Sequence, residues 1–258
     1  MPLRLIVCVK SVVIAAPGGV AKRTPGNSEL NPFDRPALEA AIRIKETMGG
    51  SVTALSMGPG VSAEALSEAQ AMGVDRAVLI NDRSLAGSDT LVTSRVLAAA
   101  VRRIGGFDFI FFGTRTADSD TGQVGPQTAG ILDVPFLSRV KKMENRGDSW
   151  VVRRTMDAWE EVWEVQSPAA ATIDPQNFTP RPVSLAGISR VYDRPALEQW
   201  TLTDLNLAAE AVGLAGSPTR VAALTKIKRD RTCEMLSGDP RDQANALIER
   251  LTISGKIG

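Results

Sequence analysis

Short apolar runs alternate with segments of helical periodicity along the first half of the chain. Apolar runs of this length predict strands, and apolar residues spaced by three and four predict helices between them. Each helical segment ends in glycine, as helix C-termini often do. The predicted strands are 3–10, 51–57, 76–80 and 107–113, and the predicted helices are 33–49, 62–73 and 89–105. This alternation predicts an α/β fold, a parallel sheet with helices on both faces.

The pattern changes in the second half of the chain. Alternating polarity over 150–167 predicts a β-hairpin that turns near Asp157. The proline-rich segment 174–183 predicts an irregular surface loop, and residues 214–241 show no regular period. Residues 242–255 again have the spacing of a helix. The sequence therefore predicts one α/β domain followed by a more loosely organised tail.

Polar residues and glycines lie where the predicted strands lead into helices. In a parallel sheet these loops share one edge, which is where ligands of such folds bind. Asn31 is expected to cap the first helix, with Pro32 at the first helical position and Asp34 completing a capping box. Ser88 or Asp89 is expected to cap the third helix.

The longest of these loops reads GTRTADSDTG over 113–122 and leads into a helix. A helix N-terminus presents unpaired backbone N–H groups and a partial positive charge, so it suits a phosphate. Gly122 and Gly125 let the backbone approach an anion, and the hydroxyls of the loop can donate to phosphate oxygens. Its two aspartates either bind the loop's own amides or accept from ribose hydroxyls. The loop is thus a candidate nucleotide cradle, with a plain structural turn as the alternative.

Composition limits the chemistry of such a site. The chain has 258 residues, a formal net charge of +1 and no histidine. Near neutrality argues against nucleic acid or anionic membrane as partners, and the apolar runs are too short to span a bilayer. Without histidine, Ser–His and Cys–His catalysis and imidazole metal sites are excluded. Cys8 and Cys233 form no disulfide framework, so we expect a reducing, cytoplasmic setting.

Several separated motifs resemble the β subunit of electron transfer flavoprotein. They follow the family's order over nearly the whole chain and include IVCVK (6–10), NPFDRPALEAAIRIKE (31–46), SMGP (56–59), EAQAMGVDRAVLI (68–80), GSDTLVTS (87–94), DSDTGQVGPQTA (118–129) and PRPVSLAGISR (180–190). The resemblance implies a Rossmann-like fold similar to the adenine-nucleotide α-hydrolases. It also implies a heterodimer with an α subunit that carries the redox-active FAD.

The resemblance further implies how the chain is divided. Residues 1–216 would form the nucleotide-binding domain, with the hairpin 150–167 and a partner-recognition loop near 174–190. Residues 217–258 would form a C-terminal arm that embraces the α subunit.

Carried over position by position, the family's nucleotide site falls on the loops that follow the strands. The site holds AMP or, in electron-bifurcating members, a second FAD. The segments DSDTGQVGP and GSDTLVTS resemble the FAD-holding members. The residues expected to contact either ligand are Cys8, Asn31, Pro32, Phe33, Asp34, Met57, Gly113, Thr114, Arg115, Thr116, Ala117, Asp118, Ser119, Asp120, Thr121, Gly122, Gln123 and Val124. Those added for the diphosphate and ribityl chain of FAD are Ser88, Asp89, Thr90 and Thr93.

The implied function is electron transfer through bound flavin, with no catalytic side chain and no metal. Electrons would pass between NADH, or an acyl-CoA-type or other flavin dehydrogenase, and the FAD of the α subunit. In bifurcation they would divide between that FAD and a low-potential acceptor such as ferredoxin or flavodoxin. Two alternatives stay open. One is a non-bifurcating β subunit with structural AMP, and the other is a stand-alone ATP-binding stress or sensor module. The long tail from residue 217 argues against the second.

Overall fold

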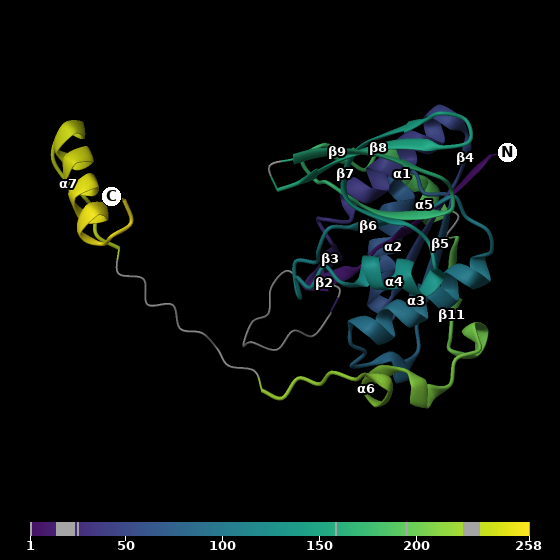
Figure 1. Ribbon diagram of the computed structural model, residues 1–258. Helices are drawn as coiled ribbons and strands as arrows, with labels where there is room; N and C mark the ends of the chain where they lie inside the picture. Colours follow the sequence, from purple (N-terminus) through teal and green to yellow (C-terminus); the bar gives the residue numbers. More distant parts are fainter. Residues whose placement is uncertain are drawn as a thin grey trace. The chain divides into compact units, whose positions relative to one another are not determined.

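The computed structural model describes residues 2–13, 24, 26–157, 159–193, 196–223 and 233–257 (Figure 1). The chain divides into two compact units, Met1–Val221 and Ala222–Gly258. We describe each unit by itself. Within the predicted arm, residues 224–232 lie outside the described residues. The predicted domain boundary at 216/217 stays a prediction.

Within the described residues of the first unit, nine strands form one sheet in the order β11-β5-β4-β1-β6-β10-β7-β8-β9. Neighbours from β11 to β7 run parallel, and β8 and β9 continue the sheet as an antiparallel hairpin. The strands are β1 (Leu3–Cys8), β4 (Gly50–Met57), β5 (Arg76–Ile80), β6 (Phe109–Gly113), β7 (Phe136–Asn145), β8 (Trp150–Met156), β9 (Trp159–Val165), β10 (Ala169–Ile173) and β11 (Leu197–Trp200). A separate antiparallel pair joins β2 (Ser11–Val13) and β3 (Ser28–Leu30).

Helices cover both faces of this sheet (Figure 1). On β1, Leu5 and Val7 belong to the core layer that contains α1 and α2, whereas Ile6 and Cys8 belong to the layer that contains α3 and α4. Each fully buried aliphatic side chain of these layers contributes about 1.5–3 kcal/mol. The helices of the unit are α1 (Arg35–Met48), α2 (Ala63–Met72), α3 (Thr90–Ile104), α4 (Val124–Leu132), α5 (Leu185–Asp193) and α6 (Gly213–Gly216). Short 3-10 turns are η2 (Gly60–Ser62), η3 (Arg83–Leu85), η4 (Thr203–Leu205) and η5 (Ala209–Ala211).

The predicted fold class is confirmed, and so are the four strands and three helices of the first half. Their ends differ by one or two residues; β1, for example, ends at Cys8 and β6 begins at Phe109. The hairpin is also confirmed, with Met156 paired to Trp159 and Asp157 in the left-handed region at φ 50°. A positive φ is tolerated best by glycine, Asn and Asp, which suits Asp157 to this turn.

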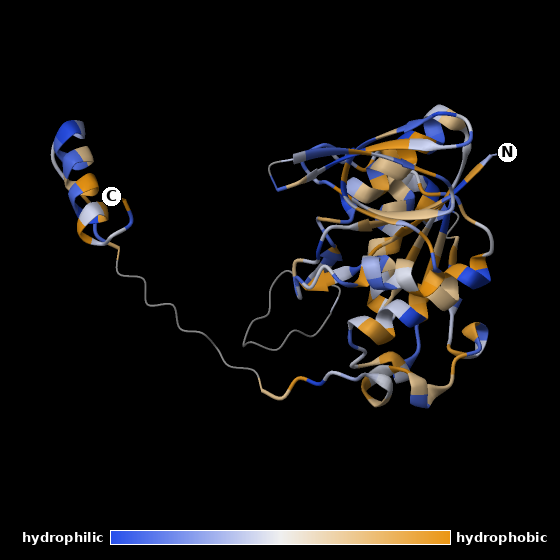
Figure 2. Cartoon of the chain, viewed as in Figure 1, coloured by the Kyte–Doolittle hydropathy of each residue, from blue (hydrophilic) through white to orange (hydrophobic). Residues whose placement is uncertain are grey.

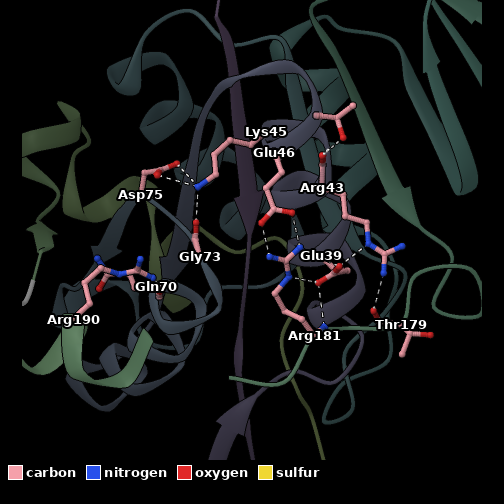
Figure 3. A network of polar contacts seen from close by, with 11 residues as sticks. Glu39, Arg43, Lys45, Glu46, Gln70, Gly73, Asp75, Thr179, Arg181 and Arg190 are labelled. Atoms are coloured by element: carbon pink, nitrogen blue, oxygen red, sulfur yellow. Dashed lines mark hydrogen bonds and ion pairs between the residues drawn. The ribbon is translucent and has the colours of Figure 1, made fainter. Parts of the chain in front are cut away.

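The irregular segment after β10 is attached to α1 by ion pairs (Figure 3). Arg181 Nε lies 2.8 Å from Glu39 Oε2, and its Nη1 lies 2.6 Å from Glu46 Oε1. Arg43 Nε donates to the other Glu39 oxygen at 2.6 Å. Burial, the largest influence, raises the pKa of Glu39, but the hydrogen bonds from both arginines hold that pKa below its usual value. The carboxylate of Glu39 therefore stays ionised inside the protein and fixes the segment that carries Arg181.

The second unit contains α7 (Pro240–Ile253), which confirms the last predicted helix. Its N-cap residue Asp239 accepts hydrogen bonds from two backbone N–H groups, and Pro240 stands at the first helical position. Leu247, Ile248 and Ile253 are exposed on this largely polar helix (Figure 2). No helix within the described residues has the length and apolar character needed to cross a membrane.

Candidate functional site

The parallel register brings the ends of three strands together. Cys8 at the end of β1 is level with Leu55 of β4 on one side and Phe112 of β6 on the other. The segments that follow these strands therefore share one edge of the sheet, the carboxyl edge at which such folds bind ligands. The predicted site residues lie in these segments and at the starts of α3 and α4.

Asn31 connects the turn before α1 to the loop after β6. The side chain is fully buried. Its Nδ2 donates to the Arg115 carbonyl at 2.9 Å and to Asp34 Oδ1 at 2.8 Å, and its Oδ1 accepts from the Ala117 N–H at 3.2 Å. One amide thus holds two peptide groups of a loop that is remote in sequence.

The predicted capping role of this turn is wrong. α1 begins at Arg35, its N-cap residue is Asp34, and no side-chain hydrogen bond caps it. The side chains of Asn31 and Asp34 accept no hydrogen bond from the first turn of α1, because they bind the neighbouring loops and each other. Pro32 lies in the turn before the helix, and Pro36 takes the early helical position.

Asp34 is a buried carboxyl that accepts from the Lys10 N–H at 2.8 Å as well as from Asn31. Burial raises the pKa of Asp34 to about 7, against the lowering effect of hydrogen bonds from Lys10, Asn31 and the Gly113 N–H. A side chain at Gly113 would collide with the Asp34 carboxyl and the Phe33 carbonyl. The close contact between these segments therefore requires glycine at 113.

Cys8 lies beside this carboxyl and is buried and free. Burial, and in second place the charge of Asp34, raises the pKa of the Cys8 thiol far above its usual value. Because the thiolate is the nucleophilic and metal-binding form of cysteine, this raised pKa disfavours both roles for Cys8. Its packing role agrees with its place in the apolar strand, and its contact with a nucleotide stays a prediction.

The loop after β6 is held from the β1 side by Lys10. Lys10 Nζ lies 2.6 Å from Asp118 Oδ1 and 3.1 Å from Ser119 Oγ. Asp120, in the left-handed region at φ 52°, pairs with Arg115 at 3.5 Å. Both aspartates of the loop thus contact cations, and their predicted contact with ribose hydroxyls stays a prediction. Arg115 also lies over the Phe33 ring at 4.4 Å.

Lys10 is the residue that sequence reasoning missed. The apolar pattern assigned it to a strand over 3–10, but β1 ends at Cys8, so both the backbone N–H and the ammonium of Lys10 reach the site. The sequence did contain an indication of this pair. Lys10 lies at the end of one predicted strand and Asp118 lies in the loop after another, and such segments meet at the carboxyl edge of a parallel sheet.

Asp89 confirms its predicted capping role, since its Oδ1 accepts from the Val92 N–H at 2.9 Å. Its Oδ2 accepts from the Thr219 hydroxyl at 2.8 Å, and its N–H donates to Ser217 Oγ at 2.9 Å. Burial acts most strongly on the pKa of Asp89 and raises it, yet the hydrogen bonds that its carboxylate accepts from Val92 and Thr219 help to hold the pKa below its usual value. Ser88 does not cap; its hydroxyl donates to the Leu85 carbonyl instead.

The starts of α3 and α4 are linked directly. Thr90 Oγ1 lies 3.0 Å from Gln123 Oε1, and Ser94 Oγ lies 3.3 Å from the Val124 carbonyl. The half-buried Met57 packs against the core layer of these helices. The N-termini of α3 and α4, each the positive end of a helix dipole, thus meet at this edge of the sheet, and at α3 the Asp89 carboxylate already accepts from the Val92 N–H.

Fold and residues together define an α/β protein with a polar candidate site at the carboxyl edge of its sheet. Residues 19–205 match the electron transfer flavoprotein domain. The chain is 40% identical over 224 residues to the electron transfer flavoprotein subunit beta of Thermoanaerobacterium thermosaccharolyticum. The aligned residues cover 87% of this chain and 86% of that protein.

Two further relatives extend the match over nearly all of both chains. The electron transfer flavoprotein subunit beta of Clostridium acetobutylicum is 37% identical over 255 residues, covering 96% of this chain and 98% of that protein. The caffeyl-CoA reductase-Etf complex subunit CarD of Acetobacterium woodii is 36% identical over 257 residues with the same coverage. The chain therefore belongs to the electron transfer flavoprotein family, matches its β subunits, and has a role in electron transfer.

Proposed function

We propose that the chain is the β subunit of a heterodimeric electron transfer flavoprotein that holds FAD at the carboxyl edge of its sheet. It passes electrons between NADH or a flavin dehydrogenase and the FAD of an α subunit. The hydrogen bond between Thr90 and Gln123 carries this proposal. It places two helix N-termini beside each other, an arrangement that suits the two phosphates of a dinucleotide.

The residues present fit such a ligand. Backbone N–H groups of the loop 114–123, apart from those of Ala117 and Asp120, and the Thr121 hydroxyl can donate to phosphate oxygens. Asp118 is paired with Lys10, so its charge is compensated beside a phosphate. The flavin supplies the redox chemistry, and the chain binds it, orients it and sets its surroundings.

The proposal includes flavin-based electron bifurcation, in which electrons from NADH divide between the α-subunit FAD and a ferredoxin- or flavodoxin-like acceptor. Relatives named as subunits of a caffeyl-CoA reductase-Etf complex and of an acryloyl-CoA reductase support an acyl-CoA-type dehydrogenase as partner. The free cysteines Cys8 and Cys233 support a cytoplasmic setting. A β subunit with structural AMP, without bifurcation, is the alternative.

Two exposed apolar surfaces support the proposed partners. In the segment 174–190 and just beyond it, Leu185, Ile188 and Tyr192 are exposed on α5, which suits a recognition element. The exposed apolar residues of α7 support an arm that covers part of the α subunit.

The test is to co-express the chain with its α subunit, purify the complex gently and identify the extracted nucleotides by chromatography. Two FAD per heterodimer is the expected result. One FAD and one AMP would favour the alternative, and ATP on a chain that binds no α subunit would favour the sensor module. Replacing Thr121 and Gln123 together by alanine is expected to empty the site. A complex without any adenine compound would overturn the proposal.

A further inference from the structure

Three side chains, from the segments that follow β1 and β3, are linked to the loop that follows β6. Asn31 holds the Arg115 carbonyl and the Ala117 N–H, and Lys10 holds the Asp118 carboxylate and the Ser119 hydroxyl. Asp34 binds the Lys10 N–H and the Asn31 amide. Asp34 therefore joins the two residues that grip the loop.

The two contacts of Asn31 constrain backbone direction. In a trans peptide the C=O and the N–H point in opposite directions. Because the Arg115 carbonyl points at Asn31, the N–H of Thr116 points away from that buried amide. Because the Ala117 N–H points at Asn31, the carbonyl of Thr116 also points away, and it accepts from the Asp120 N–H at 3.0 Å. One side chain thus sets the orientation of two successive peptide groups.

Lys10 also places a positive charge beside the Asp118 carboxylate of the loop. The Lys10 and Asp118 side chains are only 32% and 16% exposed. Lys10 therefore offsets negative charge on Asp118 next to the proposed phosphate site, where a less compensated carboxylate would repel a phosphate more strongly.

We propose that Lys10, Asn31 and Asp34 form a clasp that holds the backbone of residues 113–119 in the shape that receives the nucleotide. This inference rests on the proposed function and deepens it. In this clasp the side chains of Asn31 and Asp34 are positioning groups, and the ligand meets the N–H groups of the loop that they orient. Lys10 is a positioning residue through its contacts with Asp118 and Ser119.

The test uses the full chain, stripped of nucleotide, with the variants Lys10→Met, Lys10→Arg and Asn31→Ala. Lys45→Met is a matched control, because Lys45 also forms a partly buried pair with an aspartate, Asp75 at 3.0 Å, away from this site (Figure 3). Hydrogen–deuterium exchange of the peptide 113–119 reports how firmly the loop is held. Calorimetric titration with AMP and with FAD reports the Kd.

Lys10→Met and Asn31→Ala are expected to speed exchange in 113–119 and to weaken nucleotide binding by about tenfold or more. Lys10→Arg keeps a cation within reach of Asp118 and is expected to restore both quantities, and Lys45→Met is expected to change neither. If Asn31→Ala does not fold, the result for Lys10→Met decides whether the clasp exists. This variant is expected to fold because the Lys10 side chain is partly exposed.

An unchanged exchange rate of the peptide 113–119 in Lys10→Met would overturn the clasp. Faster exchange with an unchanged Kd for AMP and FAD would also overturn it, because the contacts would then have a purely structural role. A wild-type chain that binds neither AMP nor FAD would instead overturn the proposed function. The exchange rates would then still decide whether Lys10 and Asn31 hold the loop.

Discussion

Asp34 shows how one buried group can make stability depend on pH. An unperturbed aspartate ionises near pH 4, whereas burial raises the pKa of Asp34 to about 7. Between these values the folded chain binds a proton that the unfolded chain has lost. Stability from this group is therefore fully present below about pH 4 and is lost as pH rises through about 7. The chain has no histidine, so a change near neutrality points to a shifted group such as this one.

We predict that Asp34→Asn changes this pH dependence. The neutral amide cannot ionise, so the melting temperature of the variant is expected to gain on that of the wild type as pH rises from about 5 to about 8. The control is Asp82→Asn, because hydrogen bonds hold the pKa of Asp82 below its usual value and its effect should be constant over that range. A constant difference between wild type and Asp34→Asn would show that Asp34 titrates elsewhere.

Single residues at the site also show the reach of sequence reasoning. The capping role of Asp89 was predictable because an N-cap contacts backbone only two or three residues ahead. The fate of Asn31 was not, because an asparagine before a helix looks the same whether it caps that helix or reaches a loop more than eighty residues away. Lys10 escaped notice for the same reason.

Among the elements, α1 carries both a core face and the anchor of the irregular segment after β10. Glu39 is 3% exposed and receives hydrogen bonds from Arg181 and Arg43 (Figure 3). Breaking a buried ion pair is costly because it leaves one charge uncompensated. The attachment of the segment to α1 therefore depends mainly on Arg181, which also binds Glu46.

We predict that Arg181→Met lowers the free energy of unfolding by about 3 kcal/mol, since it removes the guanidinium hydrogen bonds to the buried Glu39 and also those to Glu46. Arg43→Met is the matched comparison and is expected to cost about 1 kcal/mol or less, because Arg43 is half exposed and Arg181 still neutralises Glu39. Urea unfolding at neutral pH measures both. Equal losses in the two variants would contradict the ranking.

The sequence did not predict strand β10, and the reason is physical. β10 reads AAATI and has no alternation, because it lies between β6 and β7 and every residue is buried. Alanine favours helices over strands, so only the neighbouring strands make this segment extended. The hairpin β8–β9 was predictable because its alternation and turn are local.

At the scale of the whole molecule, helix α7 carries exposed apolar residues. Leu247 and Ile248 are about half exposed, and Ile253 is 79% exposed. Full burial of an exposed aliphatic side chain contributes about 1.5–3 kcal/mol, so a surface that covered these residues would gain part of that for each. In the proposed heterodimer the α subunit would cover them.

We predict that Ile248→Asp weakens the complex with the α subunit by at least about tenfold, since it puts a charge on the apolar stripe. The melting temperature of the Met1–Val221 unit should stay unchanged, because α7 belongs to the other unit. Asn245→Asp adds the same charge at a polar position of the same helix and should bind normally. Sizing and titration calorimetry measure the complex. Equal binding by both variants would remove α7 from the interface.

The amino-acid sequence by itself determined the α/β class, the order of the first strands and helices, the hairpin, the last helix and the family. The class and the elements follow from local periodicity and turn chemistry, which depend on neighbouring residues, and the family follows from the resemblance of its motifs. Tertiary structure decided the partners of Lys10, Asn31 and Asp34 and the meeting of Thr90 with Gln123. Those contacts exist only because parallel strands distant in sequence end at the same edge, where their loops must satisfy one another's buried polar groups.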